Sequence, residues 1–187
     1  MTATAGFYGK IPARGDFVRH ALPPDFLNAL DGWWQAVLSG SRAALGERWT
    51  GIWMEAPVWR FALAPGVCGA GAALGLWLPS TDKAGRLFPL AIAAVAPTWR
   101  ELARGNAFLK AAEAIGFRAL EDDTGPDELA AAVAAAFIPG GEALEEPAAG
   151  SGSWWTDGSP LVSPAARRLA GMPDIGQFLA MLRDGDS

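Results

Sequence analysis

Two apolar runs, Ala72–Leu78 and Leu87–Ala96, lie on either side of a short charged stretch, and this arrangement constrains the fold more than any other feature. Short apolar runs bounded by glycine and proline are typical of buried β-strands. The short connection favours antiparallel pairing, because parallel strands need a crossover of about a dozen residues or more. We therefore expect a buried β-hairpin within a sheet.

Further strands and helices are predicted around this hairpin. Strands are expected at Phe7–Tyr8, Val58–Leu63 and Trp154–Thr156, and Arg60 in the second of these should be solvated or paired at the rim of the sheet. Apolar residues recur at helical spacing in several segments. The predicted helices are Phe26–Leu38, Glu47–Met54, Thr98–Gly116, Asp127–Phe137 and Asp174–Leu182, and a short helix is expected to start at Ser163–Pro164.

Strands that follow one another, with helices before and after them, favour an α+β fold over a doubly wound parallel sheet. We expect a single domain over residues 1–187, with a central, mainly antiparallel sheet of about five strands flanked by helices. A flexible loop is predicted around residues 139–152, which are rich in glycine, alanine, proline and glutamate, and the C-terminal tail 184–187 should be loose.

The composition excludes several classes of function. A formal charge of −5 disfavours nucleic acid and anionic membranes as main partners. Cys68 and His20 are the only residues of their types, so no internal disulfide and no cysteine or histidine metal cluster is expected. No apolar run approaches the roughly 20 residues of a membrane helix, and no signal peptide is recognisable. We expect a cytoplasmic protein without a cofactor or bound metal.

Two charged loops are the candidate binding face. The first lies within Gly6–His20, the second connects the two apolar runs, and both are anchored by apolar strands. Binding residues tend to lie on loops held by a rigid scaffold, and opposite charges are available to join these two loops. The candidate residues are Lys10, Arg14 and Asp16 from the first loop and Ser80, Asp82, Lys83 and Arg86 from the second.

These charges allow two interpretations. The cations could hold a phosphorylated or acidic group, as in an enzyme acting on a small anionic substrate. Alternatively, Arg14 or Arg86 could pair with Asp16 or Asp82 and only lock the two loops together. No clear base or nucleophile accompanies the cluster, so we assign no catalytic residue.

The nine tryptophans predict both core and surface contacts. Trp33, Trp59 and Trp77 lie on apolar stripes and are predicted to be core residues. Trp154 and Trp155 are adjacent in a predicted strand, so only one of them can face the core. The other is a candidate exposed anchor for a partner, because tryptophan is enriched at interface hot spots.

Four sequence blocks in order carry a resemblance to a known family. They are GFYGKIPARGDFVRH at Gly6–His20, APVWRF at Ala56–Phe61, PSTDKAGRLFPL at Pro79–Leu90 and SWWTDGS at Ser153–Ser159. Each block alone is weak, but their order and spacing together are specific. The chain resembles the TagF family, also called ImpM, of accessory proteins of bacterial type VI secretion systems.

The resemblance implies a cytoplasmic protein that represses type VI secretion after translation by binding the forkhead-associated scaffold protein of that system. Some relatives carry a fused protein phosphatase, whose metal motif is not visible here, so the resemblance implies the stand-alone form. An enzyme acting at the charged loops and a structural subunit of the secretion machine stay open as alternatives. The oligomeric state and the surface that meets the partner also stay open.

Overall fold

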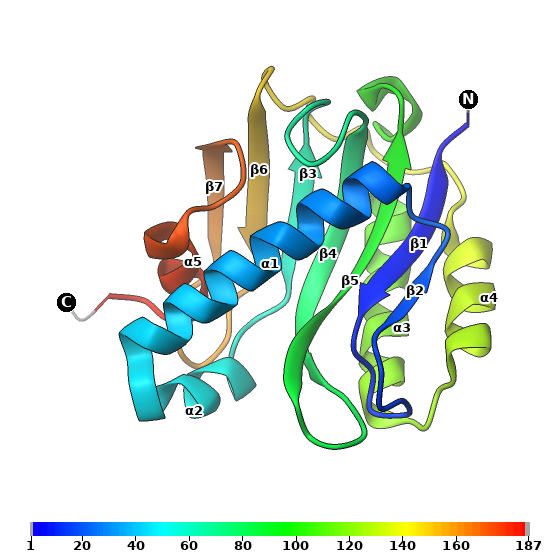
Figure 1. Cartoon of the computed structure of the whole chain (residues 1–187). Coiled ribbons are helices and arrows are strands. Elements are labelled where there is room, and N and C mark those ends of the chain that lie inside the picture. Colours follow the sequence, from blue (N-terminus) through cyan, green and yellow to red (C-terminus); the bar gives the residue numbers. More distant parts are fainter. Residues whose placement is uncertain (1, 186–187) are drawn as a thin grey trace.

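A seven-stranded antiparallel sheet forms the centre of the protein (Figure 1). The computed structural model describes residues 2–185, and the strands follow the spatial order β2-β1-β5-β4-β3-β6-β7. Their bounds are β1 Thr4–Gly9, β2 Val18–His20, β3 Trp59–Leu63, β4 Ala72–Thr81, β5 Leu87–Ala96, β6 Ser151–Thr156 and β7 Ala165–Ala170. The α+β class and the antiparallel pairing are confirmed, but the prediction of about five strands is wrong.

The two strands that the sequence did not predict are the edges of the sheet. β2 has three residues and pairs only with β1, and β7 pairs only with β6. The helix predicted to start at Ser163–Pro164 is wrong, because Ala165 opens β7. β2 is too short to show a periodic pattern, and no residue of β7 is fully buried, so neither sequence has the apolar run by which the interior strands are recognised.

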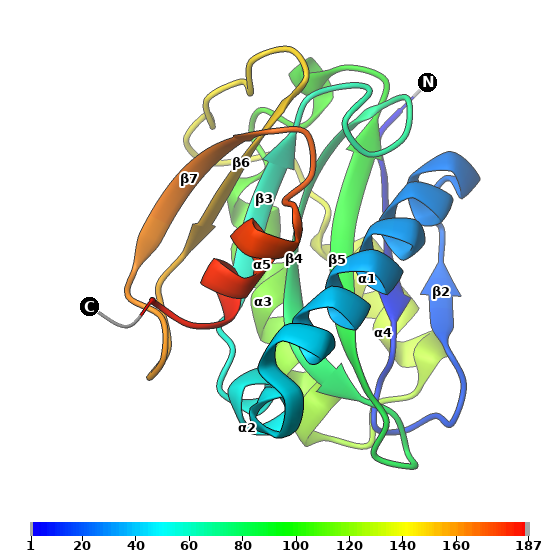
Figure 2. The same ribbon diagram turned by 60° about the vertical axis from the view of Figure 1, so that its left-hand side comes forward.

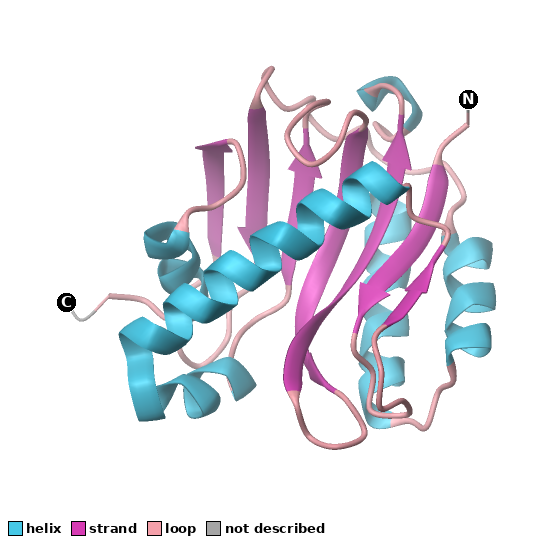
Figure 3. Cartoon of the chain, viewed as in Figure 1, coloured by secondary structure: helices cyan, strands magenta, loops and turns pink. Residues whose placement is uncertain are grey.

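Helices cover both faces of the sheet (Figures 2 and 3). Helices α1, α2 and α5 share one apolar core with one face, and α3 and α4 share a second core with the other. The helix expected from Thr98 begins later, because a short 3-10 turn ends near Leu102 and α3 starts after Gly105. The helical bounds are α1 Pro24–Leu45, η1 Gly46–Arg48, α2 Trp49–Met54, η2 Trp99–Glu101, α3 Asn106–Glu121, α4 Pro126–Ala136 and α5 Ile175–Leu182.

The core between the sheet and α1 is rich in tryptophan. Trp59 and Trp77 are fully buried, as predicted. Trp33 is not a core residue, because its ring is only partly buried and its indole N–H donates to the Pro173 carbonyl at 2.7 Å. Cys68 is buried in the same core, and burial raises the pKa of its thiol to about 12, so this cysteine packs as an apolar residue.

The adjacent tryptophans of β6 face opposite cores. Trp154 is 1% exposed and packs on Phe61, with ring centroids 5.3 Å apart. Trp155 packs against the core that α3 and α4 share and is partly buried rather than exposed. Trp154 is therefore a core residue, and Trp155 offers only part of its ring to a partner.

The two segments predicted to be flexible are irregular where the structure describes them. Residues 137–150 form neither helix nor strand. Within the predicted loose tail, the Asp184 amide donates to the Leu161 carbonyl at 2.7 Å, and the Asp184 carboxylate accepts from the Ser163 hydroxyl at 2.6 Å. Residues 186–187 of that tail lie outside the described residues.

Candidate functional site

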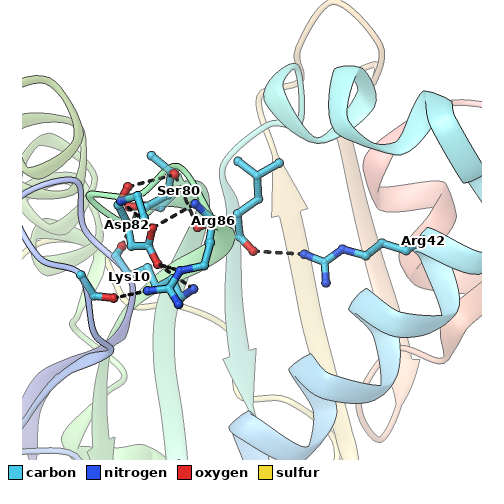
Figure 4. A network of polar contacts seen from close by, with 9 residues as sticks. Lys10, Arg42, Ser80, Asp82 and Arg86 are labelled. Carbon is cyan, nitrogen blue, oxygen red and sulfur yellow. Dashed lines mark hydrogen bonds and ion pairs between the residues drawn. The ribbon is translucent and has the colours of Figure 1, made fainter.

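The two charged loops meet at one end of the sheet, as predicted (Figure 4). The Ser80 hydroxyl donates to the Lys10 carbonyl at 2.7 Å, and the Lys10 ammonium lies 3.0 Å from the Asp82 carboxylate. These contacts form because β1 and β4 both pair antiparallel with β5, so the C-terminal ends of β1 and β4 lie at the same end of the sheet. We call Lys10, Ser80, Asp82 and Arg86 the Asp82 cluster.

Asp82 is the centre of this cluster. Its side chain is fully buried and accepts backbone N–H groups from Ala84 and Arg86 at 2.9 Å and the Arg86 Nε–H at 2.7 Å. Burial favours a raised pKa for the Asp82 carboxyl, but the Arg86 amide, Lys10 ammonium and Arg86 guanidinium outweigh it and hold the pKa well below its usual range. Asp82 is therefore an anion that fixes two cations.

The contacts favour locking of the loops, with different partners from those expected. The pair that joins the two loops is Lys10 with Asp82, whereas Arg86 and Asp82 belong to the same loop. Arg86 also joins the loops by donating to the Gly15 carbonyl. The hypothesis that Arg86 pairs with Asp82 is confirmed. The ion pair that connects the two loops, however, is formed by Lys10.

The side chains of the remaining predicted residues lie outside the cluster. Arg14 and Lys83 contribute only backbone, since the Lys83 amide donates to the Arg14 carbonyl at 2.8 Å. The side chains of Arg14, Asp16 and Lys83 are exposed and form no ion pair within residues 2–185. The cluster therefore consists of the other four predicted residues.

Replacing Asp82 with asparagine is expected to destabilise the protein at neutral pH and to matter less in acid. The native pKa lies below the unfolded value of about 3.9. The stabilisation is thus fully present above that unfolded value and is lost as the pH falls through the native pKa. Urea unfolding at pH 7 and pH 3 measures the difference between parent and variant, which should shrink at the lower pH.

Asp16→Asn is the matched control, because Asp16 is an exposed aspartate on the neighbouring loop. This variant should unfold like the parent at both pH values. A difference between Asp82→Asn and the parent that is equally large at both pH values would contradict the assigned role of the Asp82 charge.

A groove of about 640 Å³ opens beside the Asp82 cluster, between α1 and the start of β5. We call it the Arg42 groove, and its lining includes Lys10, Phe17, Arg42, Trp49, Arg86 and Phe88. Arg42 lies in the last turn of α1 and donates to the Leu87 carbonyl at 3.1 Å (Figure 4). Its guanidinium also stacks over the Trp49 ring at 4.3 Å. The site thus includes a cation that sequence reasoning missed.

Arg42 carried only a weak signal in the sequence. An arginine in the last turn of a helix is common, because it interacts favourably with the helix dipole and the last carbonyls. Its place in the groove depends on how α1 crosses the sheet, which no local pattern specifies.

A second cavity, of about 500 Å³, contains another charged cluster. Arg60 of β3 donates to Glu113 of α3 at 3.1 Å and to Asp157 at 2.8 Å. Burial favours a lower pKa for Arg60, but the two carboxylates outweigh it and raise that pKa. The prediction that Arg60 is paired at the rim is confirmed, and Glu113 and Asp157 are partners that sequence reasoning did not identify.

Within residues 2–185, no group of three or more His, Cys, Asp or Glu side chains is placed to hold a metal ion. No helix in this part of the chain has the length and apolarity needed to cross a membrane.

The chain is similar to a known protein family and to a solved structure. A family model described as the TagF N-terminal domain, type VI secretion system-associated, matches residues 6–136. The crystal structure of PA0076 from Pseudomonas aeruginosa PAO1 matches with a TM-score of 0.85 and 29% sequence identity, covering 98% of this chain and 96% of that one. No curated protein matches the sequence. The family match includes both charged loops, and the structural match extends over the remaining sequence block.

Proposed function

The chain belongs to the TagF family of type VI secretion system-associated proteins, and from this premise we propose that it represses type VI secretion after translation by binding another protein. The proposed partner is the forkhead-associated scaffold protein of the secretion system, which the resemblance of the four sequence blocks implies. We further propose that the protein acts in the cytoplasm and without catalysing a reaction.

The observation that supports this proposal best is the extent of the match. The family model spans residues 6–136, which contain the Asp82 cluster and the first three of the four sequence blocks. A loop face held rigidly by a buried ion pair is suited to binding, because little conformational entropy is lost when a partner docks on it.

Stoichiometric binding makes a quantitative prediction about secretion. Repression by sequestration follows mass action, so secretion should be proportional to the amount of partner that remains free. We expect secretion to be silenced once the amount of this protein reaches that of the scaffold protein. Transcripts and levels of the secretion components should stay unchanged, and deletion of the gene should raise secretion.

The deciding measurement is secretion of a type VI substrate at several levels of this protein, with both binding partners quantified in the same cells. Silencing at amounts far below those of the scaffold protein would favour an enzyme. Unchanged secretion at an excess of the protein would overturn the proposed function. Co-purification of the scaffold protein with the tagged chain tests the partner independently.

A further inference from the structure

The Arg42 groove has a charge opposite to that of the whole protein. Three cations line it, namely Lys10, Arg42 and Arg86, and no aspartate or glutamate among residues 2–185 does. Asp82, which is buried behind Lys10 and Arg86, pairs with both of them. The three cations and one carboxylate leave a local charge of +2, whereas the whole chain carries −5.

Both arginines of the groove are held in place before any ligand binds. Arg42 stacks on Trp49 and donates one hydrogen bond to the Leu87 carbonyl. Arg86 is fixed by Asp82 and by the Gly15 carbonyl. A guanidinium has five N–H donors, and these contacts use one of them on Arg42 and two on Arg86. Most donors of two positioned guanidinium groups therefore remain for a ligand.

The walls of the groove suit a peptide better than a free ion. The rings of Phe17 and Phe88 pack edge to face with centroids 4.7 Å apart, and Phe17 is 47% exposed. Trp49 is buried beneath Arg42 and supports the guanidinium from below. A volume of about 640 Å³ exceeds what a single phosphate-sized ion would fill and leaves apolar surface for neighbouring residues.

We propose, building on the regulatory function proposed above, that the Arg42 groove binds a dianionic side-chain group on a segment of a protein partner. A phosphorylated serine or threonine carries nearly two negative charges at neutral pH, and two adjacent carboxylates carry the same charge. Either group matches the local charge of +2. The planar guanidinium forks of Arg42 and Arg86 bind the oxygens of both groups in the same way.

Titration of the isotopically labelled protein with three short peptides tests this proposal. The peptides share one neutral sequence and carry, at its centre, phosphoserine, two glutamates or serine. We expect saturable shifts of the Arg42 and Arg86 side-chain N–H resonances with at least one anionic peptide and none with the serine peptide. Comparison of the two anionic peptides identifies which dianion is preferred.

Two matched arginine variants show whether the groove is responsible. Arg42→Gln should weaken binding by about tenfold, the usual effect of losing a charge-assisted hydrogen bond. Arg100→Gln removes an exposed arginine of η2 that does not line the groove and should bind like the parent. Arg42→Lys keeps the charge and loses the planar fork, so it should bind the peptide at intermediate strength. Comparison of its amide spectrum with that of the parent serves as a second check of folding.

Three outcomes would overturn the proposal. The serine peptide could produce the same shifts as the anionic peptides, or Arg42→Gln and Arg100→Gln could bind alike. Inorganic phosphate could also compete with the phosphoserine peptide at equal affinity, which would indicate a site for a free anion rather than for a protein segment.

The same variants separate this inference from the proposed function. An Arg42→Gln protein that loses peptide binding but represses secretion like the parent would remove the groove from regulation and leave the repressor function standing. A parent protein that binds the anionic peptide but never represses secretion would overturn the function and leave the binding site standing.

Discussion

Replacing Trp77 with alanine is expected to lower the free energy of unfolding by about 3–5 kcal/mol, the usual cost of removing a buried tryptophan. Trp77 lies in β4 and is fully buried. Its ring centroid lies 5.2 Å from that of Trp34 in α1 and 6.0 Å from that of Trp53 in α2. The substitution would leave a cavity between β4 and the helices α1 and α2, and no single neighbouring side chain could fill it.

Urea unfolding of purified variants measures this loss. Trp77→Phe should cost less, because it keeps an aromatic ring and removes an indole N–H that has no acceptor within residues 2–185. Met54→Ala is the surface control, since Met54 is 66% exposed, and its effect should stay within about 0.5 kcal/mol. A Trp77→Ala protein as stable as the parent would show that this core is not packed as described.

The second large effect is expected for alanine at position 9. Gly9 has a φ of +142°, which side-chain-bearing residues rarely adopt, and an added Cβ would lie 2.0 Å from the Pro89 carbonyl oxygen. That oxygen belongs to the backbone of β5 and accepts the Lys10 amide, so it cannot move aside without disturbing the sheet. We expect Gly9→Ala to destabilise the protein by at least about 2 kcal/mol.

Gly15→Ala provides the control within the same loop. An added Cβ at Gly15 meets no atom within 4 Å, so this variant should unfold like the parent. Because Lys10 follows Gly9 directly, Gly9→Ala should also displace the Lys10 ammonium from Asp82 and weaken anion binding in the Arg42 groove. Equal thermal stability of the two glycine variants would contradict the tight approach of β1 to β5.

The interior of the fold was predictable because its signals are local. The hairpin of β4 and β5 could be read from two apolar runs and a short connection. The alternation of Trp59, Arg60 and Phe61 assigned the two faces of β3 correctly, since side chains on a strand alternate between faces. The meeting of the two charged loops followed from their anchoring on these strands.

The rest depended on packing between distant segments. β7 contains Arg167 and Arg168 beside alanines, a pattern that does not indicate a strand without its partner β6. Trp33 lies on the apolar stripe of α1, but its contacts include Pro173 and Phe178 of α5, and they leave it only partly buried. Arg42 joined the candidate site for the same reason, through the position of α1 over the start of β5.

The two edges of the sheet also limit how a partner can bind. Some proteins recruit a peptide by adding it as an extra strand to an exposed edge. Here one edge, β2, offers only three residues, and the side chains at the other edge, β7, are already engaged, since Arg167 donates to the Ala180 carbonyl and Arg168 pairs with Glu145. Short edges and charged side chains disfavour strand addition. We therefore expect the proposed partner to be recognised by side chains of loops and grooves, so that point substitutions would change the specificity of the interaction without any change of the fold.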